Sequence, residues 1–248
     1  FHTTDRTATM KLFYFSKAPL ASSVSFSPSA YGAPSEQALD DVLTSTVARD
    51  ADPAWFDGCR NDALGELAAR ELADGGASLA RARFLHVVAV DARDPDTLVH
   101  LQSAWAVAKW FVASGASVLL DAGATRWWSG EAIAALVADR AFDLDREILC
   151  VLESAPRAGQ PGHLLHTRGM AKFARPDVMT FASRVDAAAA GAVLRTLAGQ
   201  MADGRLVAPG AAIEVDGMRF AVSAYAPDVN APDVGLGNDG LVLLRARA

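Results

Sequence analysis

Cysteine is scarce in this chain. Cys59 and Cys150 are the only two cysteines among 248 residues, so at most one disulfide bond can form. This count excludes a small secreted scaffold held together by disulfides. A reducing compartment is the simpler expectation, and we therefore predict a cytoplasmic protein.

Positive charge is also in short supply. Lys and Arg total 23 against 29 Asp and Glu, which gives a formal net charge of −6. An acidic chain is repelled by phosphate backbones and by anionic lipid. We therefore expect neither a nucleic-acid partner nor a membrane partner.

Long apolar runs are missing as well, although 51% of the residues are hydrophobic, as in a folded globular protein. The best candidate, 104–120, contains Lys109 and Gly115 and is shorter than the roughly 20 apolar residues of a membrane-spanning helix. We interpret it as a buried helix followed by a strand. Near the start of the chain, Lys17 and Pro19 interrupt the apolar run 10–15, so no secretory leader is expected.

Signatures of cofactor and catalytic sites are lacking too. The chain has no G-x-S-x-G, no P-loop, no H-E-x-x-H and no paired C-x-x-C motif. Gly235, Gly237 and Gly240 match the dinucleotide pattern G-x-G-x-x-G, but they precede a predicted strand instead of opening a helix. We interpret them as a turn and predict no cofactor. An enzyme is disfavoured but not excluded, because active sites are often assembled from distant residues.

Metal binding is not expected either. Asp139, Asp143 and Asp145 do not follow the regular alternate spacing with a glycine turn that a calcium loop needs, and Arg140 and Arg146 neutralise the group instead. His163 and His166 are three residues apart, so they would share one face of a helix but would lie on opposite faces of a strand. No third ligand stands beside them at zinc spacing.

Helical and strand patterns alternate along the chain. The apolar run 84–90 indicates a buried strand, and 98–112 forms a helical stripe with Trp105 in the core. The dipeptide Asp216-Gly217 predicts a tight hairpin turn. Leu39, Val42, Leu43 and Val47 recur at helical spacing after a potential cap, Ser35, and predict a helix.

These elements predict an α+β fold, with helices packed against a mixed, largely antiparallel sheet. The segment 154–162, rich in proline and glycine, is the best candidate for a linker or long loop. It separates an N-terminal part, 1–153, from a C-terminal part, 163–248, which we expect to pack as one globular unit. The two parts are either pseudo-repeated α/β halves or pieces of one continuous sheet.

The clearest local concentration of positive charge lies between residues 163 and 175. It is formed by His163, His166, Arg168, Lys172 and Arg175. If 169–174 is a short helix, its first-turn amides and Arg168 could bind an anion. The alternative, which we favour, is a solvated cationic turn with one histidine buried in the core.

Two further features have both a functional and a structural interpretation. Trp127 and Trp128 could form a stacking platform, but adjacent strand residues point to opposite sides, so a core or edge-covering role is favoured. Cys59 lies near a predicted helix start, where the dipole would lower a thiol pKa. No base is evident beside it, so a structural thiol is the preferred interpretation.

The segment 166–177, H-T-R-G-M-A-K-F-A-R-P-D, resembles the pattern T-x-G-M-x-x-F-x-x-P-D/E of a family of bacterial domains of unknown function (number 4261). The similarity extends over residues 84–244. The chain departs from the pattern at Ala174, where glycine is expected after the phenylalanine. The resemblance implies an α+β fold and no particular activity, cofactor or catalytic residue.

These observations lead to two functional hypotheses. The first is a non-catalytic module that binds another protein, in an immunity-related or secretion-associated setting, because catalytic motifs are absent and tryptophans are available for an interface. The second is a hydrolase or transferase acting on an anionic small molecule, with His166 as acid or base and Arg168 as anion clamp. The oligomeric state is left open.

Overall fold

The computed structural model describes residues 7–20, 26–33, 42–93, 97–137, 143–154, 162–225 and 240–245. The chain divides into two compact units, unit 1 from Phe1 to Phe142 and unit 2 from Asp143 to Ala248. The boundary precedes the strand 149–154, whereas the sequence places it after that strand.

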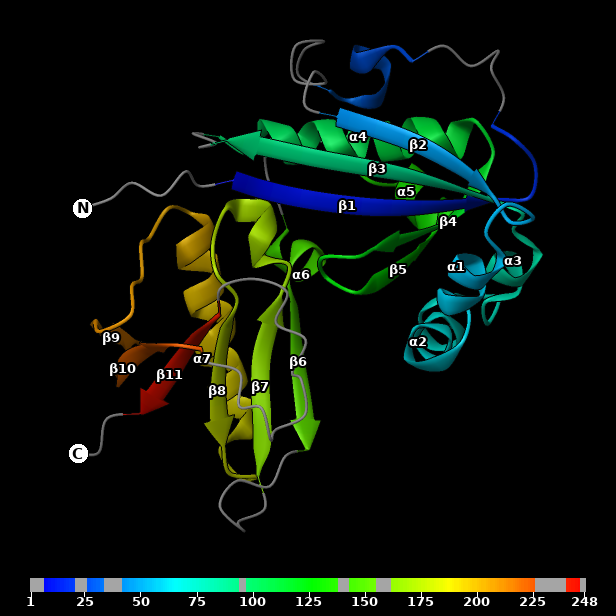
Figure 1. Cartoon of the computed structure of the whole chain (residues 1–248). Coiled ribbons are helices and arrows are strands. Elements are labelled where there is room, and N and C mark those ends of the chain that lie inside the picture. The colour runs from blue at the N-terminus through cyan, green and yellow to red at the C-terminus, as the bar shows by residue number, and fades with distance from the viewer. Residues whose placement is uncertain are drawn as a thin grey trace. The chain divides into compact units, whose positions relative to one another are not determined.

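Unit 1 is built on a five-stranded sheet with the order β2-β3-β1-β4-β5 (Figure 1). All four pairings are antiparallel. Its elements are β1 (Thr7–Ser16), the 3-10 helix η1 (Pro28–Tyr31), β2 (Val42–Ala48), α1 (Pro53–Gly58), α2 (Asp62–Glu71), α3 (Ala77–Arg81), β3 (Phe84–Arg93), α4 (Val99–Ala113), β4 (Ala116–Asp121), β5 (Arg126–Ser129) and α5 (Gly130–Ala134).

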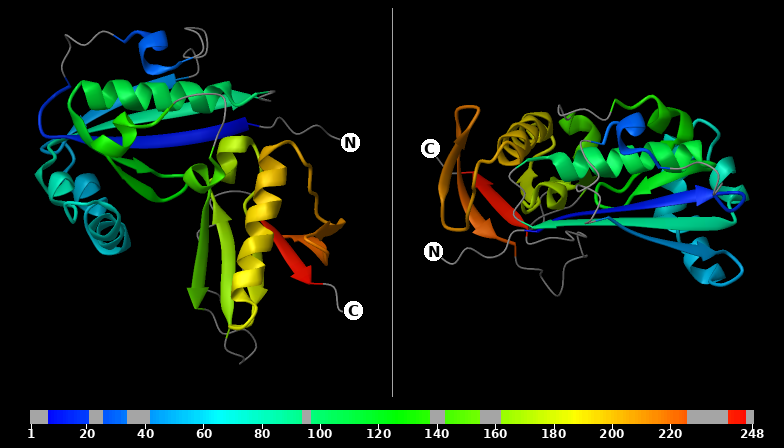
Figure 2. Two further views of the ribbon diagram at one scale, coloured as in Figure 1. Left: turned by 180° about the vertical axis from the view of Figure 1, so that it is seen from behind. Right: turned by 90° about the horizontal axis from the view of Figure 1, so that it is seen from above.

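Neighbouring residues of the central strand β1 pack against helices on opposite faces of the sheet. Tyr14 stacks on Phe111 of α4, with ring centroids 4.6 Å apart. Phe15 faces the other way, and its ring centroid lies 6.0 Å from that of Phe56 in α1 and 5.6 Å from that of Trp127. Helix α4 therefore covers one face and α1 to α3 the other, as the two views of Figure 2 show.

The helix expected around Val42, Leu43 and Val47 is wrong, because these residues lie in strand β2. Ser35 and Leu39 are outside the described residues. Val42, Thr44, Thr46 and Val47 are β-branched, and such side chains favour extended backbone. Pairing with β3, from Val42↔Val90 to Ala48↔Phe84, then overrides a helical spacing of only a few apolar residues.

Unit 2 contains a six-stranded sheet with the order β6-β7-β8-β11-β10-β9, in which only the β8–β11 pairing is parallel among the pairings described. Helix α7 packs on strands of this sheet. The elements are α6 (Leu144–Glu147), β6 (Leu149–Ser154), β7 (His163–Arg168), the 3-10 helix η3 (Met170–Phe173), β8 (Val178–Ala182), α7 (Ala187–Ala202), β9 (Ala212–Val215), β10 (Met218–Ala224) and β11 (Leu241–Arg245).

The structure confirms the predicted α+β fold, in which helices pack against largely antiparallel sheets. The described strands form two sheets, however, and not one continuous sheet. The predicted hairpin is also confirmed, since β9 and β10 pair across Asp216 and Gly217, both with positive φ. Gly235, Gly237 and most of the predicted linker lie outside the described residues.

The described helices include none that is both long and apolar enough to cross a membrane. Cys59 is buried and Cys150 half-buried, and neither is in a disulfide. Burial raises the pKa of both thiols. The structural interpretation of Cys59 thus fits its environment better than an activated thiol does.

Ala174 adopts a left-handed conformation, with φ 52° and ψ 40°, at the end of η3. This is the position at which the resemblance predicts glycine. A side chain costs about 1 kcal/mol in this region, whereas glycine adopts it freely. We therefore expect Ala174→Gly to raise the free energy of unfolding of unit 2 by about 0.5–1 kcal/mol.

The measurement is urea unfolding followed by far-ultraviolet circular dichroism. Ala198→Gly, in the interior of α7, is the matched control and should lower stability by about 1 kcal/mol. Equal destabilisation by the two substitutions would contradict the left-handed assignment.

Candidate functional site

Three strands of unit 1 meet at one end of their sheet. β1 ends at Ser16, β2 ends at Ala48, and both residues are in register with Phe84, the first residue of β3. The backbone continues the pairing for one residue beyond the strands. The Arg83 amide donates to the Ser16 carbonyl at 2.8 Å, and the Arg49 amide donates to the Arg83 carbonyl at 2.8 Å.

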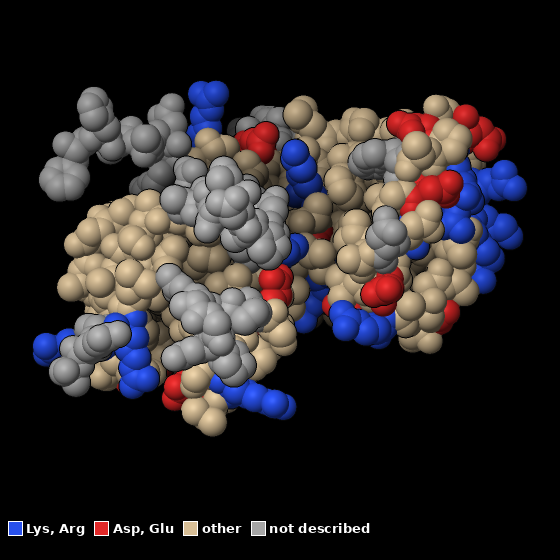
Figure 3. All heavy atoms as spheres, turned by 60° about the horizontal axis from the view of Figure 1, so that its bottom comes forward, with Lys and Arg blue, Asp and Glu red and all other residues tan. Residues whose placement is uncertain are grey.

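The residues next to these strand ends carry positive charge. Lys17 follows β1, Arg49 follows β2, Arg83 precedes β3, and Arg81 ends α3. Together with Asp50, Ala80 and Ala82 they line a cavity of about 460 Å³. We call this the basic pocket. Lys and Arg side chains gather at this end of unit 1, the end of the sheet at which β1 and β2 finish (Figures 1 and 3).

The four cations of the basic pocket differ in how they are paired. Arg49 Nη2 lies 2.8 Å from Asp57 Oδ1, and Arg81 Nη2 lies 3.9 Å from Asp74 Oδ2. Lys17 and Arg83 are exposed, and no carboxylate of the described residues is paired with either. Lys17 and Arg83 are therefore the cations most available to an incoming anion.

A partly buried chain of hydrogen bonds lies at the same end of the sheet. Ser16 Oγ donates to the Ala18 carbonyl at 2.6 Å and lies 2.9 Å from His86 Nε2. Because its one proton is used, Ser16 accepts from Nε2–H, which leaves His86 Nδ1 to accept from Thr46 Oγ1 at 2.9 Å. This tautomer is assigned from the network.

The Ser16 and His86 pair is not arranged as a nucleophile and its base. A catalytic serine gives its proton to the histidine. Here the proton points at a backbone carbonyl, and Ser16 is 0% exposed. Burial lowers the pKa of His86 from 6.5 to about 4, so the ring is neutral at pH 7. The chain of hydrogen bonds therefore joins β1, β2 and β3 structurally.

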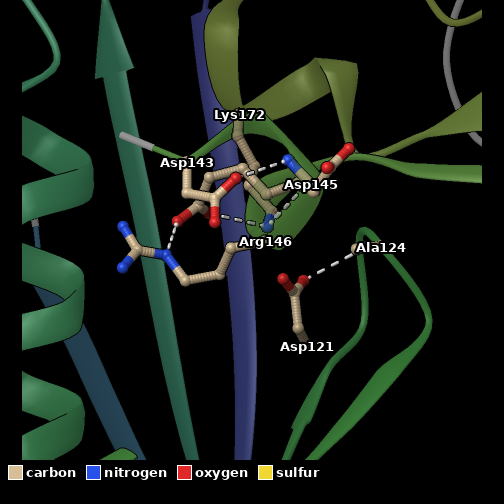
Figure 4. A network of polar contacts seen from close by, with 7 residues as sticks. Asp121, Ala124, Asp143, Asp145, Arg146 and Lys172 are labelled. Atoms are coloured by element: carbon tan, nitrogen blue, oxygen red, sulfur yellow. Dashed lines mark hydrogen bonds and ion pairs between the residues drawn. The ribbon is translucent and has the colours of Figure 1, made fainter. Parts of the chain in front are cut away.

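The structure places Lys172, from the predicted cationic cluster, in the interior of unit 2. Its side chain is 0% exposed, and Nζ donates to the Glu147 carbonyl at 3.0 Å and to Glu147 Oε2 at 3.1 Å. Arg146 Nε donates to Glu147 Oε1 at 2.9 Å. Figure 4 shows Arg146 and Lys172 converging on the same carboxylate group, with Asp143 capping the Asp145 amide beside them. Lys172 is thus neither solvated nor part of a surface patch.

The anion expected at the short helix 169–174 is supplied by the chain itself. Asp177 is 5% exposed, and its Oδ1 accepts from Thr167 Oγ1 at 3.0 Å and from the Met170 amide at 3.3 Å. Burial raises the pKa of Asp177, and these two hydrogen bonds oppose the rise. The first-turn amide of this segment therefore has an internal partner.

The other residues of the cluster are also held within unit 2. His166 is 0% exposed, with Nε2 3.2 Å from Glu153 Oε1. Arg175 donates to the Met201 carbonyl at 3.1 Å, at the end of α7, where a cation is favourable. His163 and Arg168 are half-buried on β7. The predicted burial of one histidine is confirmed, but the solvated cationic turn is not what the structure shows.

The tryptophan pair behaves as strand alternation predicts. Trp127 is 3% exposed, and its indole N–H donates to the Leu64 carbonyl at 3.0 Å. Trp128 points to the other side, and its ring centroid lies 5.5 Å from that of Trp105. Arg126 Cζ lies over the Trp128 ring, 5.4 Å from its centroid. The core role of Trp127 is confirmed.

Comparisons of the chain with protein-family models, with curated proteins and with solved structures found no match. The resemblance of segment 166–177 to a bacterial family of unknown function therefore stays a prediction. Within the described residues, no group of three or more His, Cys, Asp or Glu side chains could hold a metal ion.

The sequence does not identify the basic pocket as a site. Lys17, Arg49, Arg81 and Arg83 are spread over the chain in no motif. Each of Lys17, Arg49 and Arg83 is adjacent to a strand end, which is the signal that could have grouped them. Because the sequence predicts a helix where β2 lies, the strand end beside Arg49 is not recognised from the sequence.

The low pKa of His86 predicts that unit 1 loses stability in mild acid. The unfolded histidine binds a proton below about pH 6.5 and the folded one only near pH 4, so the free energy of unfolding falls across this window, by about 3 kcal/mol at most. His86→Gln, which cannot titrate, should lack this part of the loss. All five tryptophans lie in unit 1, so tryptophan fluorescence during urea unfolding at each pH reports this unit. An identical acid loss in the variant would contradict the assignment.

The buried ion pair between Lys172 and Glu147 predicts that removing one partner lowers the free energy of unfolding more than removing both. Lys172→Met leaves the Glu147 carboxylate buried without its ammonium partner and should cost about 3–5 kcal/mol. The double variant Glu147→Leu/Lys172→Met should recover part of that loss. Far-ultraviolet circular dichroism in urea measures both. A loss below about 1 kcal/mol for the single variant would show that the pair is not buried in solution.

Proposed function

We propose that this protein is a non-catalytic module that binds another protein, and that the basic pocket of unit 1 receives an acidic group of that partner. The observation that carries the proposal is the convergence of Lys17, Arg49, Arg81 and Arg83 on one cavity of an otherwise acidic chain. Local positive charge attracts an anionic partner even when the net charge is negative, because charges beyond a Debye length are screened.

The exposure of the pocket favours a macromolecular partner over a small molecule. Small-molecule sites enclose most of their ligand and are lined mainly by apolar groups. Lys17, Arg81 and Arg83 are exposed, and among the described residues that line the basic pocket only Ala80 and Ala82 are uncharged. Such a surface suits the protruding carboxylates of a protein segment.

The surroundings of the pocket favour binding without chemistry. The buried hydroxyl of Ser16 is committed to the Ala18 carbonyl, and His86 is neutral and hydrogen-bonded on both ring nitrogens. The second hypothesis, catalysis by His166 and Arg168, gains no support from the placement of His166, which has no exposed surface.

The test measures the affinity of the full chain for a fluorescein-labelled oligoglutamate peptide by fluorescence anisotropy. We expect binding that weakens as salt is added and is about tenfold weaker in the double variant Lys17→Glu/Arg83→Glu, because two favourable charges become repulsive. Lys11→Glu/Arg184→Glu is the matched control, since it changes the net charge equally at two exposed positions outside the pocket.

The control variant should stay within about twofold of the wild type. Equal weakening in both double variants would reduce the effect to net charge and overturn the proposal. Full binding of inorganic phosphate at concentrations where the peptide does not bind would also overturn it, in favour of a small-anion site.

A further inference from the structure

The basic pocket adjoins an edge of the unit 1 sheet that is free of any further described strand. β2 is an outer strand in the order β2-β3-β1-β4-β5 and pairs only with β3 among the described strands. An edge strand carries a row of backbone N–H and C=O groups that can pair with another strand. Arg49, which lines the pocket, directly follows the last residue of β2.

The sequence of β2 itself carries none of the features that usually protect an edge. Its sequence, VLTSTVA, contains no proline and no charged residue, and nothing interrupts its register with β3 over seven residues. Leu43, Thr44, Ser45 and Thr46 are all exposed, with Leu43 at 67%. Side chains on both faces of the strand are therefore accessible to a partner that pairs with its edge.

The opposite edge of the same sheet is different. β5 has four residues, and its Trp127 is anchored to α2 through the Leu64 carbonyl and the Glu71 carboxylate. The long unprotected edge and the cationic pocket thus occur together at β2. One ligand that satisfies both is an extended segment with acidic residues at one end.

We infer that the partner docks as an added strand: an extended segment pairs with the free edge of β2, and its acidic residues enter the basic pocket. This inference rests on the proposed function and specifies the class of partner. Addition of a strand supplies affinity through main-chain hydrogen bonds, and the pocket supplies selectivity for carboxylates.

The direction of the added strand follows from the sheet. All described pairings in this sheet are antiparallel, so we assign an antiparallel addition. The pocket lies at the carboxyl end of β2, and an antiparallel neighbour brings its amino end to that position. The acidic residues of the partner therefore precede its extended segment.

The test uses a labelled peptide in which a few glutamates precede about six alternating threonines and valines, the usual length of a strand. Two N-methylated versions are compared with it, methylated on alternate amides in the odd or the even set. Because only one set of amides faces β2, one version should bind at least about tenfold more weakly and the other within about twofold. A peptide with the glutamates at the carboxyl end should also bind more weakly.

Amide hydrogen exchange of the full chain provides the second measurement. Peptide binding should slow exchange at alternate residues of β2. Binding by the two methylated versions as tight as by the parent, with unchanged exchange in β2, would overturn strand addition while leaving the pocket in place. If the parent peptide shows no dependence on Lys17 and Arg83, the proposed function itself fails. Dimerisation of the free chain that protects β2 would assign this edge to a second copy and overturn the inference.

Discussion

The register of β1 against β3 is the constraint on which unit 1 depends. The two strands pair over ten residues, from Thr7↔Arg93 to Ser16↔Phe84. Because side chains alternate, a shift of one residue would exchange the faces of Tyr14 and Phe15. It would separate Phe15 from Phe56 and Tyr14 from Phe111. The same register fixes Lys17 and Arg83 at one end of the sheet, so the apolar packing and the basic pocket have a common cause.

In unit 2, by contrast with the exposed cations of the basic pocket, Lys172 and Arg175 bind to groups of the unit itself. The cluster between 163 and 175 is the densest positive segment in the sequence, yet Lys172 is paired with the buried Glu147 and Arg175 donates to the Met201 carbonyl in the last turn of α7. Removing such charges from water is unfavourable unless each is paired. These cations are therefore held within unit 2, whereas Lys17 and Arg83 of the basic pocket are exposed.

Much of the local structure follows from short-range chemistry and is predictable. The strand around 84–90, the hairpin at Asp216-Gly217 and the burial of Trp127 all depend on alternation or on backbone conformation within a few residues. The local signals of β2 conflict, because its β-branched residues favour a strand while its apolar spacing fits a helix, and only the pairing with β3 decides its conformation. The candidate site was missed for the same reason: Arg49 and Arg83 become neighbours only once β2 is placed beside β3.

We propose that unit 1 binds the acidic peptide at the end of the sheet where strand register brings Lys17, Arg49 and Arg83 together. This proposal can be tested by titrating the ¹⁵N-labelled chain with the acidic peptide and following the amide resonances by nuclear magnetic resonance. We expect the largest amide shifts at Lys17, Arg49, Asp50 and residues 80–83, continuing along β2. Shifts confined to residues 163–175, or absent from the basic pocket, would contradict it.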